Sequence, residues 1–171
     1  DKYLLILKLL KQFAMKENKG IIGLFNYGHA DKLSLNDFTR YRSFGRKIRA
    51  KQFLFSHLIA DGFRDEFRYI SIAHKDKFVV IAASNGPIGV DIEDISKHRN
   101  FISLAEFMGF NNVKSLDDFY RLFTLYEAKY KAASNTNLKE HFYKLGNYMI
   151  CIVSNDSNTT WVNRDLIPEQ I

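Results

Sequence analysis

The sequence predicts an α+β fold made of two similar halves, each a helix packed on a small antiparallel sheet. Helical and β-rich segments follow one another in the same order twice, in 1–85 and again in 86–171. The composition is that of a globular protein, with 46% hydrophobic and 26% charged residues. No low-complexity segment or long linker separates the halves, which share no sequence identity. We expect them to pack as one unit, related by a pseudo-twofold axis with the active site between them.

The first half contains two predicted helices and a short strand. Residues 3–15 are densely apolar and predict a helix, although 4–7 suit a buried strand equally well. A short strand is predicted over 21–25, and a second helix ends at Asp61-Gly62. The segment 40–51 carries six basic residues and no acidic one: Arg40, Arg42, Arg46, Lys47, Arg49 and Lys51.

Three β-rich runs follow at the centre of the chain, over 67–73, 78–83 and 88–93. The last two are separated by Ser84-Asn-Gly-Pro87, and Asn-Gly is a strong hairpin signal. The spacing therefore predicts an antiparallel meander of three strands.

The second half repeats this order. A helical region is predicted to end in a long helix over about 117–133. Three further β-rich runs, 142–145, 148–153 and 159–162, predict a second meander.

Charge and cysteine content limit the possible partners and sites. The net charge of +6 and a sequence pI near 9.3 favour an anionic partner. The single Cys151 excludes an internal disulfide framework and a multi-Cys zinc site, and its apolar surroundings predict a buried, inert thiol. No run approaches the length of a membrane span, so we expect a soluble, cytoplasmic protein with no membrane partner.

The strand over 88–93, Ile-Gly-Val-Asp-Ile-Glu, carries the first candidate site. Alternation places Gly89, Asp91 and Glu93 on one face. Neighbouring carboxylates repel each other unless a cation or hydrogen-bond donors lie between them, and such oxygen ligands suit Mg²⁺. The alternative, which the hexapeptide alone favours, is a half-buried strand with a hydrated acidic face.

The long helix carries the second candidate site. Phe123, Glu127 and Lys131 recur every four residues and form one stripe. Glu127 precedes Lys131 in the favoured order for a helical ion pair, so an exposed salt bridge is the simpler interpretation of this stripe alone.

Together the two segments resemble the Sfp-type 4′-phosphopantetheinyl transferases. That family pairs a strand reading (V/I)-G-(V/I)-D-x-E with a later helix reading (W/F)-(S/T)-x-K-E-(A/S)-x-x-K. Residues 88–93 match the first pattern in full, and 123–131 match the second at every specified position but one. Ala73-His74 also matches the Ser/Ala-His that precedes the second meander strand of the family. Two linked motifs with the right order and spacing are far more specific than either alone.

The resemblance implies transfer of 4′-phosphopantetheine from coenzyme A to a serine of an apo acyl or peptidyl carrier protein, with Mg²⁺ as cofactor. Asp91, Glu93 and Glu127 match the metal-binding acids of the family. Glu127 also matches the residue that takes the proton of the attacking serine. Lys131 matches a lysine on the coenzyme A phosphates. The duplicated fold implies that a monomer suffices.

Further phosphate contacts are implied in the first half. His74 matches a histidine on the 3′-phosphate of coenzyme A. Lys51 falls where the family has an arginine, and Arg42 and Arg46 are further candidates by a looser alignment.

The chain departs from the family pattern at Tyr126, which stands in place of the lysine before the helix glutamate. Lys129 is the nearest candidate in sequence to replace that cation. The family's Gly-Lys-Pro element ahead of the first meander strand is also missing. Two alternatives therefore stay open: a catalytically impaired relative that binds coenzyme A or a carrier protein, and a basic nucleic-acid-binding domain suggested by 40–51. The second lacks the usual base-reading motifs and leaves the three acids unexplained, so we expect no nucleic-acid partner.

Overall fold

The structure is a computed structural model. It describes residues 56, 60, 63–76, 78–134 and 137–155, and the backbone of 21–26, 160–161 and 169–170. The predicted helix over 3–15 and the basic segment 40–51 lie outside the described residues.

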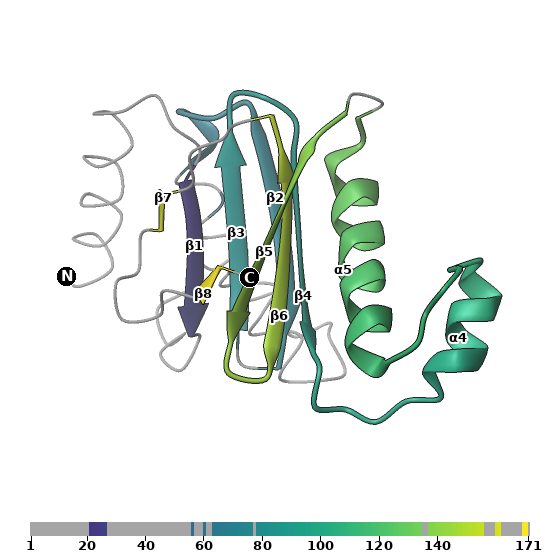
Figure 1. Ribbon diagram of the computed structural model, residues 1–171. Helices are drawn as coiled ribbons and strands as arrows, with labels where there is room; N and C mark the ends of the chain where they lie inside the picture. The colour runs from purple at the N-terminus through teal and green to yellow at the C-terminus, as the bar shows by residue number, and fades with distance from the viewer. Residues whose placement is uncertain are drawn as a thin grey trace, which may run out of the picture.

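The described residues form a mixed α+β fold with two four-stranded sheets, which confirms the α+β part of the prediction (Figure 1). The first sheet has the order β2-β3-β1-β7, from strands Tyr69–Lys75, Phe78–Ser84, Ile21–Asn26 and Thr160–Trp161. The second has the order β4-β6-β5-β8, from strands Ile88–Asp94, Tyr148–Ser154, Lys139–Leu145 and Glu169–Gln170. All neighbouring strands are antiparallel except β1 and β7, which pair in parallel.

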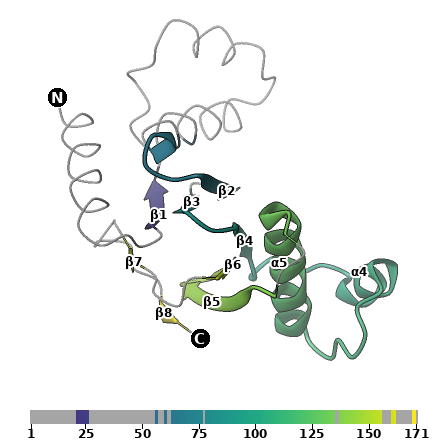
Figure 2. The same cartoon turned by 90° about the horizontal axis from the view of Figure 1, so that it is seen from above.

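The second sheet is covered on both faces. One face packs on the first sheet through apolar side chains that include Val80, Val90 and Ile150. The other face packs on helix α5, Leu116–Ala132, through side chains that include Ala128 and Cys151. Figures 1 and 2 show α5 beside the second sheet, with helix α4, Phe101–Met108, farther out. The strand β4 is therefore buried on both sides.

Helix α5 begins and ends at residues suited to those positions. The Ser115 side chain caps its first turn by accepting a hydrogen bond from the Asp118 backbone N–H at 3.0 Å. Asp117 and Asp118 lie in the first turn and Lys129 and Lys131 in the last, so all four charges oppose the helix dipole. Ala133 ends the helix in the left-handed conformation. The predicted helix over about 117–133 is confirmed to within a residue at each end.

The prediction of a central three-strand meander is wrong for its last strand. Strands β2 and β3 form the expected antiparallel pair, but β4 pairs with β6 in the other sheet, with Asp91 opposite Cys151. The segment around Asn85-Gly86 thus joins two sheets. The physical reason is burial, because β4 is apolar on one face and closely packed on the other. A place between the first sheet and α5 satisfies both faces.

The second predicted meander is also only partly formed. Strands β5 and β6 are the expected hairpin. The third run does not extend it: Thr160 and Trp161 pair in parallel with β1 in the first sheet. Within the described part of the chain, no helix is long and apolar enough to cross a membrane.

Candidate functional site

The candidate site begins with an unusually close approach between β4 and α5 at Gly89. A Cβ atom added there would lie 1.9 Å from the Ala128 carbonyl oxygen and 2.8 Å from the Ala132 backbone nitrogen. Only glycine lets the strand and the helix backbone approach this closely. The glycine of the motif therefore brings the acids of β4 next to the residues of α5.

The alternation predicted for β4 is confirmed. Ile88, Val90 and Ile92 belong to the core between the two sheets. Gly89 and Asp91 pair with Val153 and Cys151, whose side chains pack in the core beneath α5. The acidic face of the strand is thus the face that α5 covers.

Asp91 is the most buried acid of the site, with 7% of its surface exposed. Its Oδ1 accepts a hydrogen bond from Lys131 Nζ at 2.7 Å, and the same ammonium donates to the Val90 carbonyl at 3.2 Å. Burial raises the pKa of Asp91 to about 6, opposed by the Lys131 charge and reinforced by the charges of Glu93 and Glu127. Within the described part of the chain, Asp91 Oδ2 is buried and has no hydrogen-bond partner.

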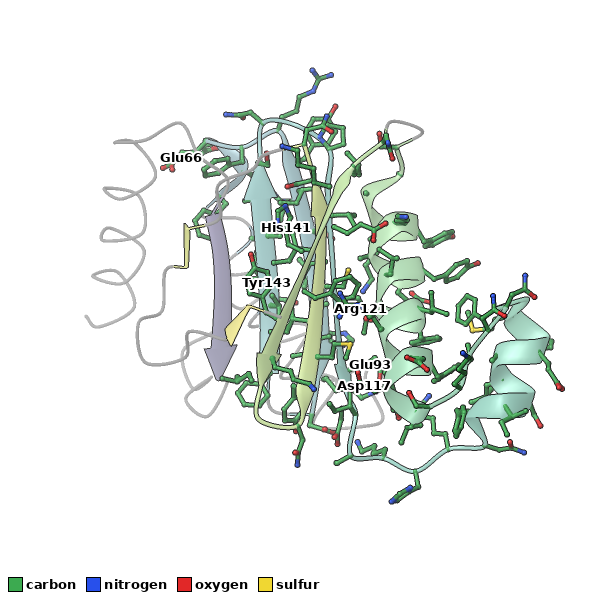
Figure 3. All side chains as sticks on the ribbon, in the orientation of Figure 1. Glu66, Glu93, Asp117, Arg121, His141 and Tyr143 are labelled. Atoms are coloured by element: carbon green, nitrogen blue, oxygen red, sulfur yellow. The ribbon has the colours of Figure 1, made fainter. Side chains whose placement is uncertain are left out.

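Glu93 is held by cations from two other segments. Lys75 Nζ of β2 donates a hydrogen bond to Glu93 Oε2, and Arg99 Nη2 lies 3.9 Å from the same oxygen. The Glu93 side chain is 12% exposed. Figure 3 shows it on the α5 side of the second sheet.

Glu127 faces this cluster from α5. It is half-buried, and its charge is one of the smaller causes that raise the pKa of Asp91. The simple helical salt bridge is not formed, since Lys131 binds Asp91 instead and Glu127 makes no ion pair with any described residue. Phe123, one turn earlier, stacks on Phe119 with ring centroids 5.7 Å apart. Of the predicted stripe, Lys131 is the residue that contacts an acid of β4.

Tyr126, which stands where the family pattern has lysine, is half exposed. Its ring packs edge-on against Phe110, with centroids 6.1 Å apart. Lys129 pairs with Glu140 of β5 at 2.6 Å, and both side chains are exposed. Neither residue supplies a cation to Asp91 or Glu93.

The predicted phosphate-binding residues of the first half are described only at His74. This residue is exposed near the end of β2, opposite Val79 of β3. Its neighbours in the strand, Ala73 and Lys75, alternate to the other face, which packs toward the second sheet. Lys51, Arg42 and Arg46 lie outside the described residues.

The acids fit a divalent cation in kind. Asp91, Glu93 and Glu127 are hard oxygen donors, and Asp91 Oδ2, which has no hydrogen-bond partner among the described residues, is available as a ligand atom. As they stand, no three His, Cys, Asp or Glu side chains among the described residues are close enough to hold a metal. Asp91 and Glu93 are each paired with a lysine instead, so metal binding requires these two ion pairs to rearrange.

Sequence reasoning missed Lys75 and Arg99 as members of the site. The predicted β-rich run ends at residue 73, but the strand β2 continues through Lys75. Its contact with Glu93 joins two sheets, and no local pattern in the sequence indicates it. The buried Cys151 is as expected: it carries no disulfide, and burial raises the pKa of its thiol well above the usual range.

Neither the models of known protein families nor the curated proteins give a match to this sequence.

Proposed function

We propose that this chain is a 4′-phosphopantetheinyl transferase of the Sfp type. It transfers the phosphopantetheine arm of coenzyme A to a serine of an apo acyl or peptidyl carrier protein and releases 3′,5′-ADP. One observation carries the proposal: the contact at Gly89 joins the two motifs of the resemblance, so that Asp91 of β4 binds Lys131 of α5. Segments some forty residues apart thus meet as one buried, charged site.

The metal of the proposed reaction is Mg²⁺, held by Asp91, Glu93 and Glu127. When bound, Mg²⁺ supplies positive charge to the diphosphate of coenzyme A and to the departing 3′,5′-ADP. Asp91 is suited to this role because its buried Oδ2 has no hydrogen-bond partner among the described residues. Burial raises the pKa of Asp91 to about 6, and a cation bound beside it would favour the ionised carboxylate.

Glu127 is the proposed general base. The serine oxygen attacks the β-phosphorus, the bond from that phosphorus to the bridging oxygen breaks, and the serine proton passes to the Glu127 carboxylate. Glu127 is suited to accept it because it makes no ion pair with a described residue, whereas Asp91 and Glu93 are each bound to a lysine. Lys131 leaves Asp91 to contact a phosphate oxygen of coenzyme A.

The first half of the chain is proposed to bind the 3′-phosphate of coenzyme A. His74 and Lys51 are the assigned contacts, with Arg42 and Arg46 as further candidates. Coenzyme A then lies between two halves related by a pseudo-twofold axis, and a cytoplasmic monomer is sufficient. The high pI supports this assignment because coenzyme A and carrier proteins are both anionic.

A second candidate function follows from Tyr126. This residue removes one cation from the family pattern and, half exposed beside Phe110, does not face the acids. A relative without catalysis would still bind coenzyme A or a carrier protein.

The experiment that separates these functions incubates the chain with Mg²⁺, coenzyme A and a panel of apo carrier proteins. Intact mass spectrometry of each carrier protein detects the added phosphopantetheine. The proposed transferase modifies at least one carrier, and only when Mg²⁺ is present. If the chain binds coenzyme A but modifies no carrier protein, it is the relative without catalysis. If it neither binds coenzyme A nor modifies a carrier protein, the proposal is overturned.

A further inference from the structure

Glu93 is bound by a lysine from the opposite sheet. Lys75 lies at the end of β2 in the first sheet, and its ammonium donates to Glu93 Oε2 of β4 in the second. The two side chains are only 18% and 12% exposed. The pair is therefore shielded from water and is not one of the many surface ion pairs that contribute little.

The packing of β2 beside β4 places Lys75 at this position. The Val90 backbone N–H donates to Ser71 Oγ at 3.0 Å, and four residues farther along β2 Lys75 reaches Glu93. Both contacts advance in the same direction along the two strands, so β2 and β4 run side by side. The next contact, from Lys97 to Asp76 at 3.2 Å, continues the series. Lys75 is thus fixed at the acid site by the arrangement of the sheets.

The site consequently contains two matched pairs, Asp91 with Lys131 and Glu93 with Lys75. Each carboxylate bound by a lysine is a proposed metal ligand. If a divalent cation binds the carboxylates while a diphosphate binds the lysines, every buried charge keeps an opposite partner. A metal ion that drew the two carboxylates away from the lysines without a bound diphosphate would leave two ammonium groups without an opposite charge. Binding of the metal and binding of the diphosphate must therefore be coupled.

We infer that Lys75 is a phosphate-binding residue of this site, which moves from Glu93 to the diphosphate of coenzyme A when Mg²⁺ binds the carboxylates. This inference rests on the proposed function. Lys75 and Lys131 then bracket the acids from β2 and α5, and they supply the cations that Tyr126 and Lys129 do not.

The inference predicts opposite changes in two affinities. Lys75→Met removes the nearer of the two cations that hold Glu93 and leaves Arg99 at 3.9 Å, so that Mg²⁺ alone binds more tightly, by about twofold to fivefold. The same variant binds coenzyme A in excess Mg²⁺ about tenfold more weakly, because one charge-assisted phosphate contact is lost. The affinity for dephospho-coenzyme A falls by the same factor, because Lys75 contacts the diphosphate and not the 3′-phosphate. If Lys75 had a purely structural role, its substitution would not change the affinities for Mg²⁺ and for coenzyme A in opposite directions.

Isothermal titration of the full chain with MgCl₂, and then with coenzyme A in excess MgCl₂, tests this. Lys129→Met is the matched control, because it removes the same charge from a Lys–Glu pair on the exposed side of α5, and it leaves both affinities unchanged. Lys75→Gln keeps a hydrogen-bond donor near Glu93 but removes the positive charge. It replaces Lys75→Met in the titrations if the Met variant does not fold. It is expected to show the same weakening toward coenzyme A.

The outcomes separate the two proposals. A wild-type chain that binds no coenzyme A overturns both the proposed function and the role of Lys75. Wild-type binding with unchanged coenzyme A affinity in the Lys75 variants overturns only the role of Lys75. A parallel loss of both affinities also overturns it, since that result identifies Lys75 as a structural residue.

Discussion

Gly89→Ala tests the contact on which the whole site depends. The new Cβ would lie 1.9 Å from the Ala128 carbonyl oxygen, 2.8 Å from the Ala132 nitrogen and 3.0 Å from the Ala128 carbonyl carbon. All three atoms belong to the backbone of α5, so no side-chain rotation relieves the overlap. Real Cβ contacts essentially never fall below 3.0 Å, and the helix must therefore retreat by about 1 Å or more.

The cost of this movement has two parts. Overpacking of a tight core costs about 1–3 kcal/mol and sometimes more. The displaced helix also loses contact with the second sheet beneath it, where Ala128 and Ala132 are buried. We expect a loss of about 3 kcal/mol in the free energy of unfolding. For a chain of this size that corresponds to a fall of about 6–12 °C in the melting temperature.

The assay is chemical denaturation followed by circular dichroism, with Gly86→Ala as the control. Gly86 precedes the same strand, and a Cβ there would meet only the Ser84 hydroxyl, at 4.0 Å. Gly86→Ala is expected to stay near wild type. If Gly89→Ala is as stable as Gly86→Ala, the close packing of β4 on α5 is refuted.

Two further predictions concern Asp91 and the first half of the chain. The folded-state pKa of Asp91, about 6, exceeds its ordinary value of 3.8, so the protonated form is favoured by folding and this stabilisation is lost as pH rises through 6. The test is denaturation of wild type and Asp91→Asn in EDTA, at about pH 4 and about pH 7.5. Between the lower and the higher pH, the free energy of unfolding of the variant should rise relative to that of wild type by about 2–3 kcal/mol. A difference independent of pH contradicts the burial of an ionisable Asp91. If His74 and Lys51 contact the 3′-phosphate, titration calorimetry should find dephospho-coenzyme A binding more weakly than coenzyme A, by about tenfold or more for each lost contact, and Lys51→Ala should narrow that gap. Equal affinities of the wild type for the two ligands would rule out the contact.

The local parts of the site could be predicted from the sequence. Strand alternation places Asp91 and Glu93 on one face of the strand and Val90 on the other, and the structure confirms this arrangement. Helical spacing aligns Phe123, Glu127 and Lys131, and the predicted bounds of the long helix agree with those of α5 to within a residue. Each of these inferences depends only on neighbours within about two turns or one strand.

The tertiary partners could not be predicted in the same way. Asn85-Gly86 is a sound local hairpin signal, but β4 leaves β3 because both of its faces need cover. The pairing of β7 with β1 joins residues near the two ends of the chain. Lys75 reaches Glu93 only because β2 and β4 lie side by side across two sheets. Such contacts follow from the packing of the complete fold and leave no periodic signal in the sequence.

The proposed phosphopantetheine transfer depends on Asp91 as a metal ligand. The rate of carrier-protein modification as Mg²⁺ is titrated, for wild type and Asp91→Ala, tests this dependence. Asp94→Ala is the matched control, because Asp94 is a buried acid of the same strand that accepts hydrogen bonds from Ser96 and lies off the site. We expect the transfer rates of wild type and Asp94→Ala to rise with Mg²⁺, and no transfer by Asp91→Ala at any Mg²⁺ concentration. Transfer by Asp91→Ala at the wild-type rate under limiting Mg²⁺ would rule out Asp91 as a metal ligand.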